Sequence, residues 1–460
     1  MRDCVDETQN VGNGKGAMKG LHFDNGKVSA LLLTVMIWLL TFQSPLETVW
    51  APLAYIDELA ALIGAVWGAY EIVVVQRCRA TKEQLWVGVP LLVFVIAGLT
   101  GNLFYRYQPM KAAIVDLYTN LKFFFAIGTG YFLFRGADWE ELKKTALLSA
   151  RCITLVLFVI FLADRVFQFW PGEVRYGLSS AKLFFQHPTY FAGAMAFLIV
   201  LLTVFFEKRN LPYLGMALVM MAFTMRSKAF ASVAAYVVLF VLFAVLQWKL
   251  KWQYVLIGGL ACAAIAWPQI RFYFVDLAGA SARSVMLLTS FVIMKDYFPI
   301  GTGFGTYASA EAAKNYSPVY VKYGFNNYWE LRDIRDVENT LRLIRENSWL
   351  TEQYQQNPDV VINWTPFFSD AFWPIIFGQT GVLGTLAYVL ALGVIVKRCL
   401  KVVNFDRYAY VGALFVFAYL LISSMAEPAF HNSVAIPLAL TMGIVFGQMA
   451  QMDLVSKKEE

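Results

Sequence analysis

The stretch from His187 to Phe206, HPTYFAGAMAFLIVLLTVFF, decides the fold class of this chain. Its last 17 residues, 190–206, carry no charged side chain. A helix needs about 20 mainly apolar residues to cross the hydrocarbon core of a bilayer. Over all 460 residues, 59% are hydrophobic, only 15% are charged, and the mean hydropathy is +0.55. These values predict an integral membrane protein and exclude a disordered chain, a coiled coil and a cytosolic enzyme.

The chain contains twelve stretches of this kind, so we expect an all-α polytopic membrane protein with about 12 transmembrane helices. The predicted spans are 28–44, 55–75, 85–104, 113–134, 146–165, 190–206, 211–225, 229–247, 253–270, 372–396, 407–425 and 434–452. The expected organisation is a leader (1–27), nine spans (28–270), a large external loop (271–371), three spans (372–452) and a tail (453–460).

The distribution of Lys and Arg predicts the orientation, because short cytoplasmic loops hold most of the positive charge. With the N-terminus inside, 21 of the 38 cations lie in cytoplasmic segments and seven in short outside loops. Both termini are therefore expected in the cytoplasm, and the protein is expected in the cytoplasmic membrane. The polar leader lacks a cleavage-site pattern, so the first apolar stretch is expected to remain as an anchor.

The net charge of +6 is typical of cytoplasmic loops and is not interpreted as nucleic-acid binding. Three of the five cysteines fall on the predicted cytoplasmic side and two within spans, so no disulfide framework is expected. The sequence has no zinc, P-loop or dinucleotide motif. We therefore expect neither a metal nor a cofactor.

The predicted external loop, about 100 residues, is far longer than a connection requires. It contains a helical apolar pattern at 284–295, a charge-laced helix at 331–356 and many aromatic residues. The aromatic residues fit either a membrane-interface belt or a sugar-binding surface. Between the two helical patterns lies IGTGFGTY, residues 300–307, which fits either a plain turn or a weak phosphate contact.

Polar residues recur where the topology places the outer leaflet. His187 fits either a helix start or a proton switch, and Arg226 and Lys228 occupy a tight turn between two spans. Arg283 opens the 284–295 helix, and Asp370 fits either an N-cap of the next span or a proton acceptor. Glu427 and His431, in the last external turn, are a further candidate pair with weaker support. Together these residues predict an external site for an anionic ligand.

From His187 onward the chain resembles the O-antigen ligase and O-antigen polymerase superfamily of bacterial envelopes. The resemblance rests on an ordered series of segments, none of which is specific alone. They are HPTYFA (187–192), RSKAF (226–230), Arg283, KDYFPIGTGFGTY (295–307) and FWPIIFGQTGVLG (372–384).

The resemblance implies a GT-C-like, metal-independent membrane glycosyltransferase that uses an undecaprenyl-diphosphate-linked glycan as donor. It implies that Arg226 and Arg283 bind the donor diphosphate, and we add Lys228 and His187 to that site. Family ligases place a histidine eleven residues before the glycine of an E-T-G segment; here that position is Asp370, and the segment is Gln379-Thr380-Gly381. Asp370 is therefore the expected general base.

The missing histidine leaves the choice between ligase and polymerase open, and with it the acceptor: a lipid core, a protein or another lipid-linked glycan. A rival interpretation is a secondary transporter with twelve spans. The absence of an internal repeat counts against it, as do the few intramembrane charges, chiefly Asp116 and Lys122.

Overall fold

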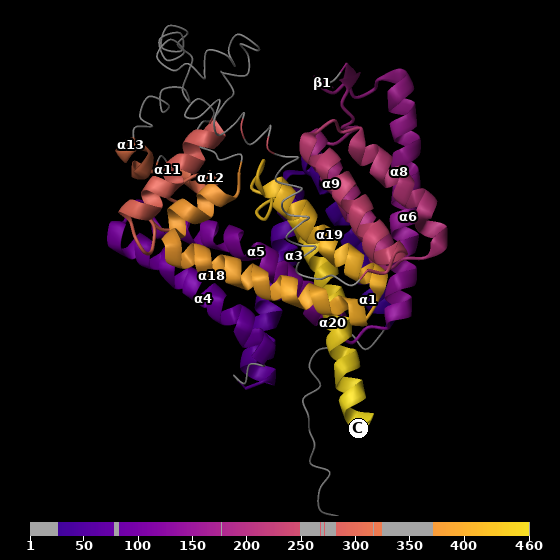
Figure 1. The fold of residues 1–460 in the computed structure, drawn as a ribbon, viewed down its shortest axis with the longest axis horizontal. Helices are drawn as coiled ribbons and strands as arrows, with labels where there is room; N and C mark the ends of the chain where they lie inside the picture. Colours follow the sequence, from indigo (N-terminus) through magenta and orange to yellow (C-terminus); the bar gives the residue numbers. More distant parts are fainter. Residues whose placement is uncertain are drawn as a thin grey trace, which may run out of the picture.

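The structure is a computed structural model that describes residues 26–77, 82–175, 177–248, 267, 271, 282–315, 317–323 and 371–459. Helices dominate it (Figure 1). The α-helices are α1 (Gly26–Thr41), α2 (Gln43–Val49), α3 (Ile56–Tyr70), α4 (Lys82–Tyr105), α5 (Met110–Phe134), α6 (Trp139–Phe167), α7 (Pro188–Val204), α8 (Leu211–Ala222), α9 (Ser227–Leu239), α11 (Ala282–Asp296), α12 (Ala310–Lys314), α13 (Pro318–Lys322), α18 (Trp373–Lys401), α19 (Arg407–Ser424) and α20 (Ala435–Glu459). Short 3₁₀ or π turns are η1 (Ala51–Tyr55), η2 (Glu71–Val75), η3 (Lys208–Asn210), η4 (Phe240–Val245) and η7 (Val402–Asn404).

The strand content of the described residues is one small hairpin. β1 (Val174–Arg175) pairs antiparallel with β2 (Leu178–Ser179), with Val174 opposite Ser179 and Arg175 opposite Leu178. The hairpin follows the C-terminal end of α6 and leads into the segment before α7 (Figure 1).

Several helices are long and apolar enough to cross a membrane. Among the described residues there are six, or seven if α1 and α2, bent by 73° at their junction, form one broken span. The six are Ala51–Val75, Gln84–Tyr105, Trp139–Phe167, Ser227–Val245, Arg407–Ser424 and Ala435–Met452. The protein is therefore an all-α, multi-pass membrane protein.

Other expected spans have a different outcome. The predicted span 253–270 lies outside the described residues. The predicted span 211–225 corresponds to α8, whose 12 residues extend about 18 Å and fall short of a bilayer core of about 30 Å. The predicted spans 113–134 and 372–396 lie in α5 and α18, which are 25 and 29 residues long but are not among these six. The predicted span 190–206 lies in α7, a shorter apolar helix of 17 residues.

Small residues let α3 and α20 approach α5 closely, one on each side of it. A Cβ at Gly64 of α3 would collide with the Phe125 carbonyl of α5, and one at Gly130 of α5 would collide with the Leu440 carbonyl of α20. Close backbone approach at small residues is the usual basis of helix association in membranes.

The segment IGTGFGTY is a buried turn that fits against the kink of α18. α18 lies along α4, and α11 packs against it (Figure 1). Gly381 has φ 60° inside α18, and its amide lies against Gly301, whose φ is 73°. The N–H groups of Thr302 and Gly303 donate to the carbonyls of Gly378 and Gln379 at 3.1 and 2.8 Å.

The next two donors of the same turn are also used within the protein. Phe304 N–H donates to Asn102 Oδ1 at 2.8 Å, and Gly305 N–H donates to Asp116 Oδ2 at 3.0 Å. None of the four N–H groups from Thr302 to Gly305 is left for a phosphate. The plain-turn interpretation of this segment is therefore the one that fits, and the turn locks α4, α5 and α18 together.

Candidate functional site

His187 begins α7 for reasons that are visible in the sequence. It precedes Pro188, and the residue before a proline is pushed into an extended conformation; His187 has φ −143° and ψ 147°. Proline in turn suits the first position of a helix, where its missing N–H is not needed. His187 Nδ1 accepts a hydrogen bond from Thr189 N–H at 3.2 Å and so caps the helix.

Arg226 stands at the N-cap of α9, directly opposite His187. Its Nη2 atom lies 2.9 Å from His187 Nε2 and 3.1 Å from Glu173 Oε1, just before the hairpin. The Arg226 side chain is 15% exposed, and its buried Nε atom has no hydrogen-bond partner among the described residues. A guanidinium is the usual partner of phosphate and carboxylate groups because of its fork of donors. Arg226 therefore keeps one donor that the described part of the chain does not satisfy.

The imidazole of His187 has two close contacts that each call for an acceptor nitrogen. Thr189 N–H lies 3.2 Å from Nδ1, and Arg226 Nη2 lies 2.9 Å from Nε2. A neutral imidazole has one N–H and one acceptor nitrogen, so its tautomer decides which of the two contacts it accepts. His187 thus lies against the guanidinium, and the Nε–H of Arg226, which has no partner among the described residues, is the donor that remains for an anionic ligand.

The local electrostatics keep His187 neutral and Glu173 ionised. Burial, followed by the charge of Arg226, lowers the pKa of His187 to about 4. Partial burial raises the pKa of Glu173, but hydrogen bonds from Arg175 and the charge of Arg226 outweigh it and hold that pKa below its ordinary value. At neutral pH the Glu173 carboxylate therefore neutralises the positive charge of Arg226.

Lys228 lies in the first turn of α9 and forms an ion pair with Glu427, in the turn after α19. Both side chains are largely buried, at 10% and 12% exposure. Glu427 and His431, which were grouped by sequence, have different partners. His431 Nε2 lies 3.0 Å from Asn120 Oδ1 of α5.

Two predicted site residues, Arg283 and Asp370, cannot be placed relative to this cluster from the described residues. The backbone of Arg283 is in the first turn of α11, which packs against α18. Its side chain lies outside the described residues, and so do Asp370, the charge-laced helix at 331–356 and most of the aromatic residues of the external loop.

The intramembrane charges singled out in the sequence both have partners. Lys122 Nζ of α5 donates to Asp57 Oδ2 of α3 at 2.9 Å, with Glu58 Oε1 at 3.8 Å. The other Asp57 oxygen accepts from Gln43 Nε2, at the bend between α1 and α2, at 2.6 Å. Asp116 accepts from Gly305 and from Asn120 Nδ2, the latter at 3.1 Å. These charges tie together helices that the sequence shows only as separate spans.

Two features of the structure were missed from sequence: the carboxylate that pairs with Arg226 and the break between α1 and α2. Glu173, the carboxylate on Arg226, lies in an exposed connection with nothing to distinguish it. Gln43 and Ser44 were placed at the end of the first predicted span, although a polar pair at a span end is a signal for a break. Comparison with family models, curated proteins and solved structures finds no match for this chain.

Proposed function

We propose that this protein is a membrane glycosyltransferase that transfers or polymerises an undecaprenyl-diphosphate-linked glycan at the outer face of the cytoplasmic membrane. The proposal includes a GT-C-like arrangement of about 12 transmembrane helices with both termini in the cytoplasm. One observation carries it: the Arg226 guanidinium is only 15% exposed, and its buried Nε–H has no hydrogen-bond partner among the described residues. A diphosphate oxygen is an acceptor of the right charge for that donor.

The reaction follows from the chemistry of the donor. The acceptor sugar hydroxyl attacks the anomeric carbon, the bond from that carbon to the diphosphate oxygen breaks, and the electron pair leaves on the diphosphate. Arg226 donates to the oxygens that gain this charge, in a site where burial strengthens such contacts, and His187 holds the guanidinium in place. Lys228 and Arg283 add positive charge, and Asp370 takes the proton from the acceptor hydroxyl.

The test is the release of undecaprenyl diphosphate by purified protein in detergent, supplied with a lipid-linked glycan and an acceptor. We expect Arg226→Ala to lower the rate about a hundredfold or more, since loss of one donor to a developing oxyanion has that effect. Arg209→Ala is the matched control, because Arg209 is 72% exposed and pairs only with Glu207 among its described contacts. Full activity in Arg226→Ala would refute the assignment.

Product length separates the two enzymatic alternatives. A single transferred glycan indicates a ligase, and a ladder of products indicates an O-antigen or exopolysaccharide polymerase. No release from any lipid-linked donor would favour a different class.

A secondary transporter is the second candidate, and one observation favours it. α1 and α2 form a broken helix bent by 73°, and the buried Lys122–Asp57 pair adjoins that bend through Gln43. Broken helices with intramembrane charges are typical of substrate and ion sites in transporters. Uptake into proteoliposomes that depends on Asp57, together with no release of undecaprenyl diphosphate, would support the transporter.

A further inference from the structure

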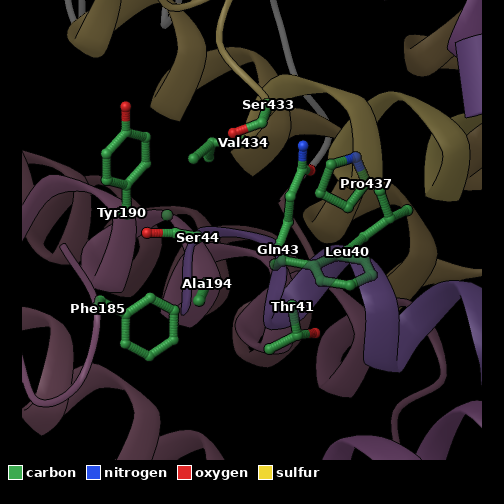
Figure 2. A pocket seen from close by; sticks show the side chains of 12 residues that line it. Leu40, Thr41, Gln43, Ser44, Phe185, Tyr190, Ala194, Ser433, Val434 and Pro437 are labelled. Carbon is green, nitrogen blue, oxygen red and sulfur yellow. The ribbon is translucent and has the colours of Figure 1, made fainter. Parts of the chain in front are cut away.

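Two cavities border α1, and they differ greatly in size. The one in Figure 2, at the bend between α1 and α2, has a volume of about 20 Å³, which is enough for one water molecule and no larger ligand. The other is a groove between α1 and α6 with a volume of about 720 Å³. Sites for small organic ligands usually measure about 300–1,000 Å³, so the groove is large enough for one.

One stripe of α6 and one stripe of α1 line the groove. Residues four positions apart lie on the same face of a helix, and both helices follow this spacing. The lining residues are Glu140, Glu141, Lys144, Thr145, Leu148, Ser149 and Cys152 of α6, with Ala30, Leu31, Thr34 and Trp38 of α1. From Glu140 to Cys152 the lined part of α6 is about 18 Å long. The groove is therefore elongated along the helix axis.

The groove is charged at one end of α6 and apolar further along. Its charged residues lie in the first two turns of α6, and Leu148, which is 63% exposed, follows them. Leu31 and Trp38 of α1 are also exposed, at 65% and 40%. The 29 residues of α6 extend about 44 Å, whereas the hydrocarbon core is about 30 Å thick. The charged end of the groove therefore lies at the level of the lipid headgroups, and the apolar part lies at the level of the acyl chains.

The charged side chains and Ser149 have no partners in the described part of the chain. Glu140 and Lys144 have the spacing of an intrahelical ion pair, yet neither of them, nor Glu141, forms an ion pair with a described residue. Ser149 is only 5% exposed, and its hydroxyl makes no hydrogen bond to the described residues. Buried hydroxyl groups are normally hydrogen-bonded, so Ser149 calls for a partner from the groove.

The charges determine which headgroup fits. The Lys144 ammonium attracts a phosphate, and the carboxylates of Glu140 and Glu141, one helical turn away, attract a cation. Phosphatidylethanolamine carries both charges on one short headgroup, and its primary ammonium has N–H donors for the carboxylates. Phosphatidylcholine has a cation without N–H donors, and phosphatidylglycerol has no cation at all. An ethanolamine headgroup is therefore the best match for this end of the groove.

We propose that the groove between α1 and α6 binds one molecule of phosphatidylethanolamine. Its phosphate lies at Lys144, its ammonium at Glu140 and Glu141, and its glycerol ester at Ser149. An acyl chain lies along the apolar part, against Leu148 and Trp38. This inference does not rest on the proposed function.

The test is lipid binding to the purified, delipidated protein, measured by native mass spectrometry. Three lipids with the same acyl chains are compared: phosphatidylethanolamine, phosphatidylcholine and phosphatidylglycerol. Wild type should bind phosphatidylethanolamine about three- to tenfold more tightly than either other lipid, as expected for two partly exposed charge contacts. Glu140→Gln combined with Glu141→Gln should abolish the preference over phosphatidylcholine. Lys144→Gln should weaken both of these lipids alike, because both carry the phosphate.

The matched control is Lys143→Gln, a half-exposed lysine of α6 that does not line the groove, and all three affinities should stay unchanged. Cys152, which is exposed and lines the groove, reports the position of the lipid. In a variant where it is the single cysteine, phosphatidylethanolamine should slow its reaction with a maleimide more than phosphatidylcholine does. Equal affinity for the three lipids, a preference for phosphatidylglycerol, or unchanged labelling of Cys152 at saturating phosphatidylethanolamine would each overturn the proposal. So would a preference that survives the double glutamate variant.

Discussion

The Lys122–Asp57 pair offers the sharpest test of how this bundle is held together. The two side chains are 6% and 3% exposed, and the charged atoms lie 2.9 Å apart. With an effective dielectric constant of about 20, charges at that distance attract by about 6 kcal/mol, which offsets the cost of removing both from water. Removing one partner leaves the other charge buried, so Lys122→Met should destabilise the protein by about 3–5 kcal/mol.

The double variant Lys122→Met with Asp57→Leu should recover most of that loss, because the only charge left without its partner is Glu58, which is 38% exposed and can be solvated. Asp57→Asn alone should be milder than Lys122→Met, since Lys122 keeps Glu58 at 3.8 Å. The assay is unfolding in mixed detergent micelles containing a denaturing detergent, followed by tryptophan fluorescence. Lys111→Met is the matched control, an exposed lysine of the same helix. Equal stability of Lys111→Met and Lys122→Met would refute the reasoning.

Three further predictions concern the site around Arg226 and the packed turn at 300–307. Glu173→Gln should tighten diphosphate binding up to about fivefold in a titration at low salt. The reason is that the partly exposed ion pair between Glu173 and Arg226, worth at most about 1 kcal/mol, no longer competes with the ligand. Weaker binding would instead make Glu173 a positioning residue. His187 should titrate near pH 4 by NMR, remaining neutral above it, and its pKa should rise in Arg226→Ala because a nearby positive charge is removed; an unchanged value would contradict the contact. Gly381→Ala, at φ 60° against the turn at 300–307, should lower thermal stability by at least about 1–3 kcal/mol, whereas Gly88→Ala, with open space around it, should not.

Much of the local structure could be predicted because it depends on neighbouring residues. Long apolar stretches give helices in a bilayer, where every backbone N–H must be satisfied within the segment. The start of α7 at Pro188, capped by His187, is of the same kind, since it depends on three consecutive residues, 187–189. The number of spans could not be predicted in this way: the stretch 211–225 gives a helix of only 12 residues, so a span there stays a prediction.

Composition and hydropathy were enough to identify a multi-pass helical membrane protein and the polar residues that interrupt its apolar stretches. Which of these residues meet depends on the folded chain: Arg226 lies against His187 and Glu173, Lys228 pairs with Glu427, and Lys122 pairs with Asp57. The fold also shows that the glycines of IGTGFGTY serve a packed turn and that the chain bends by 73° after α1. The physical reason is that a helix pattern is read from residues three or four apart, whereas a charge pair or a cavity depends on how helices distant in sequence pack.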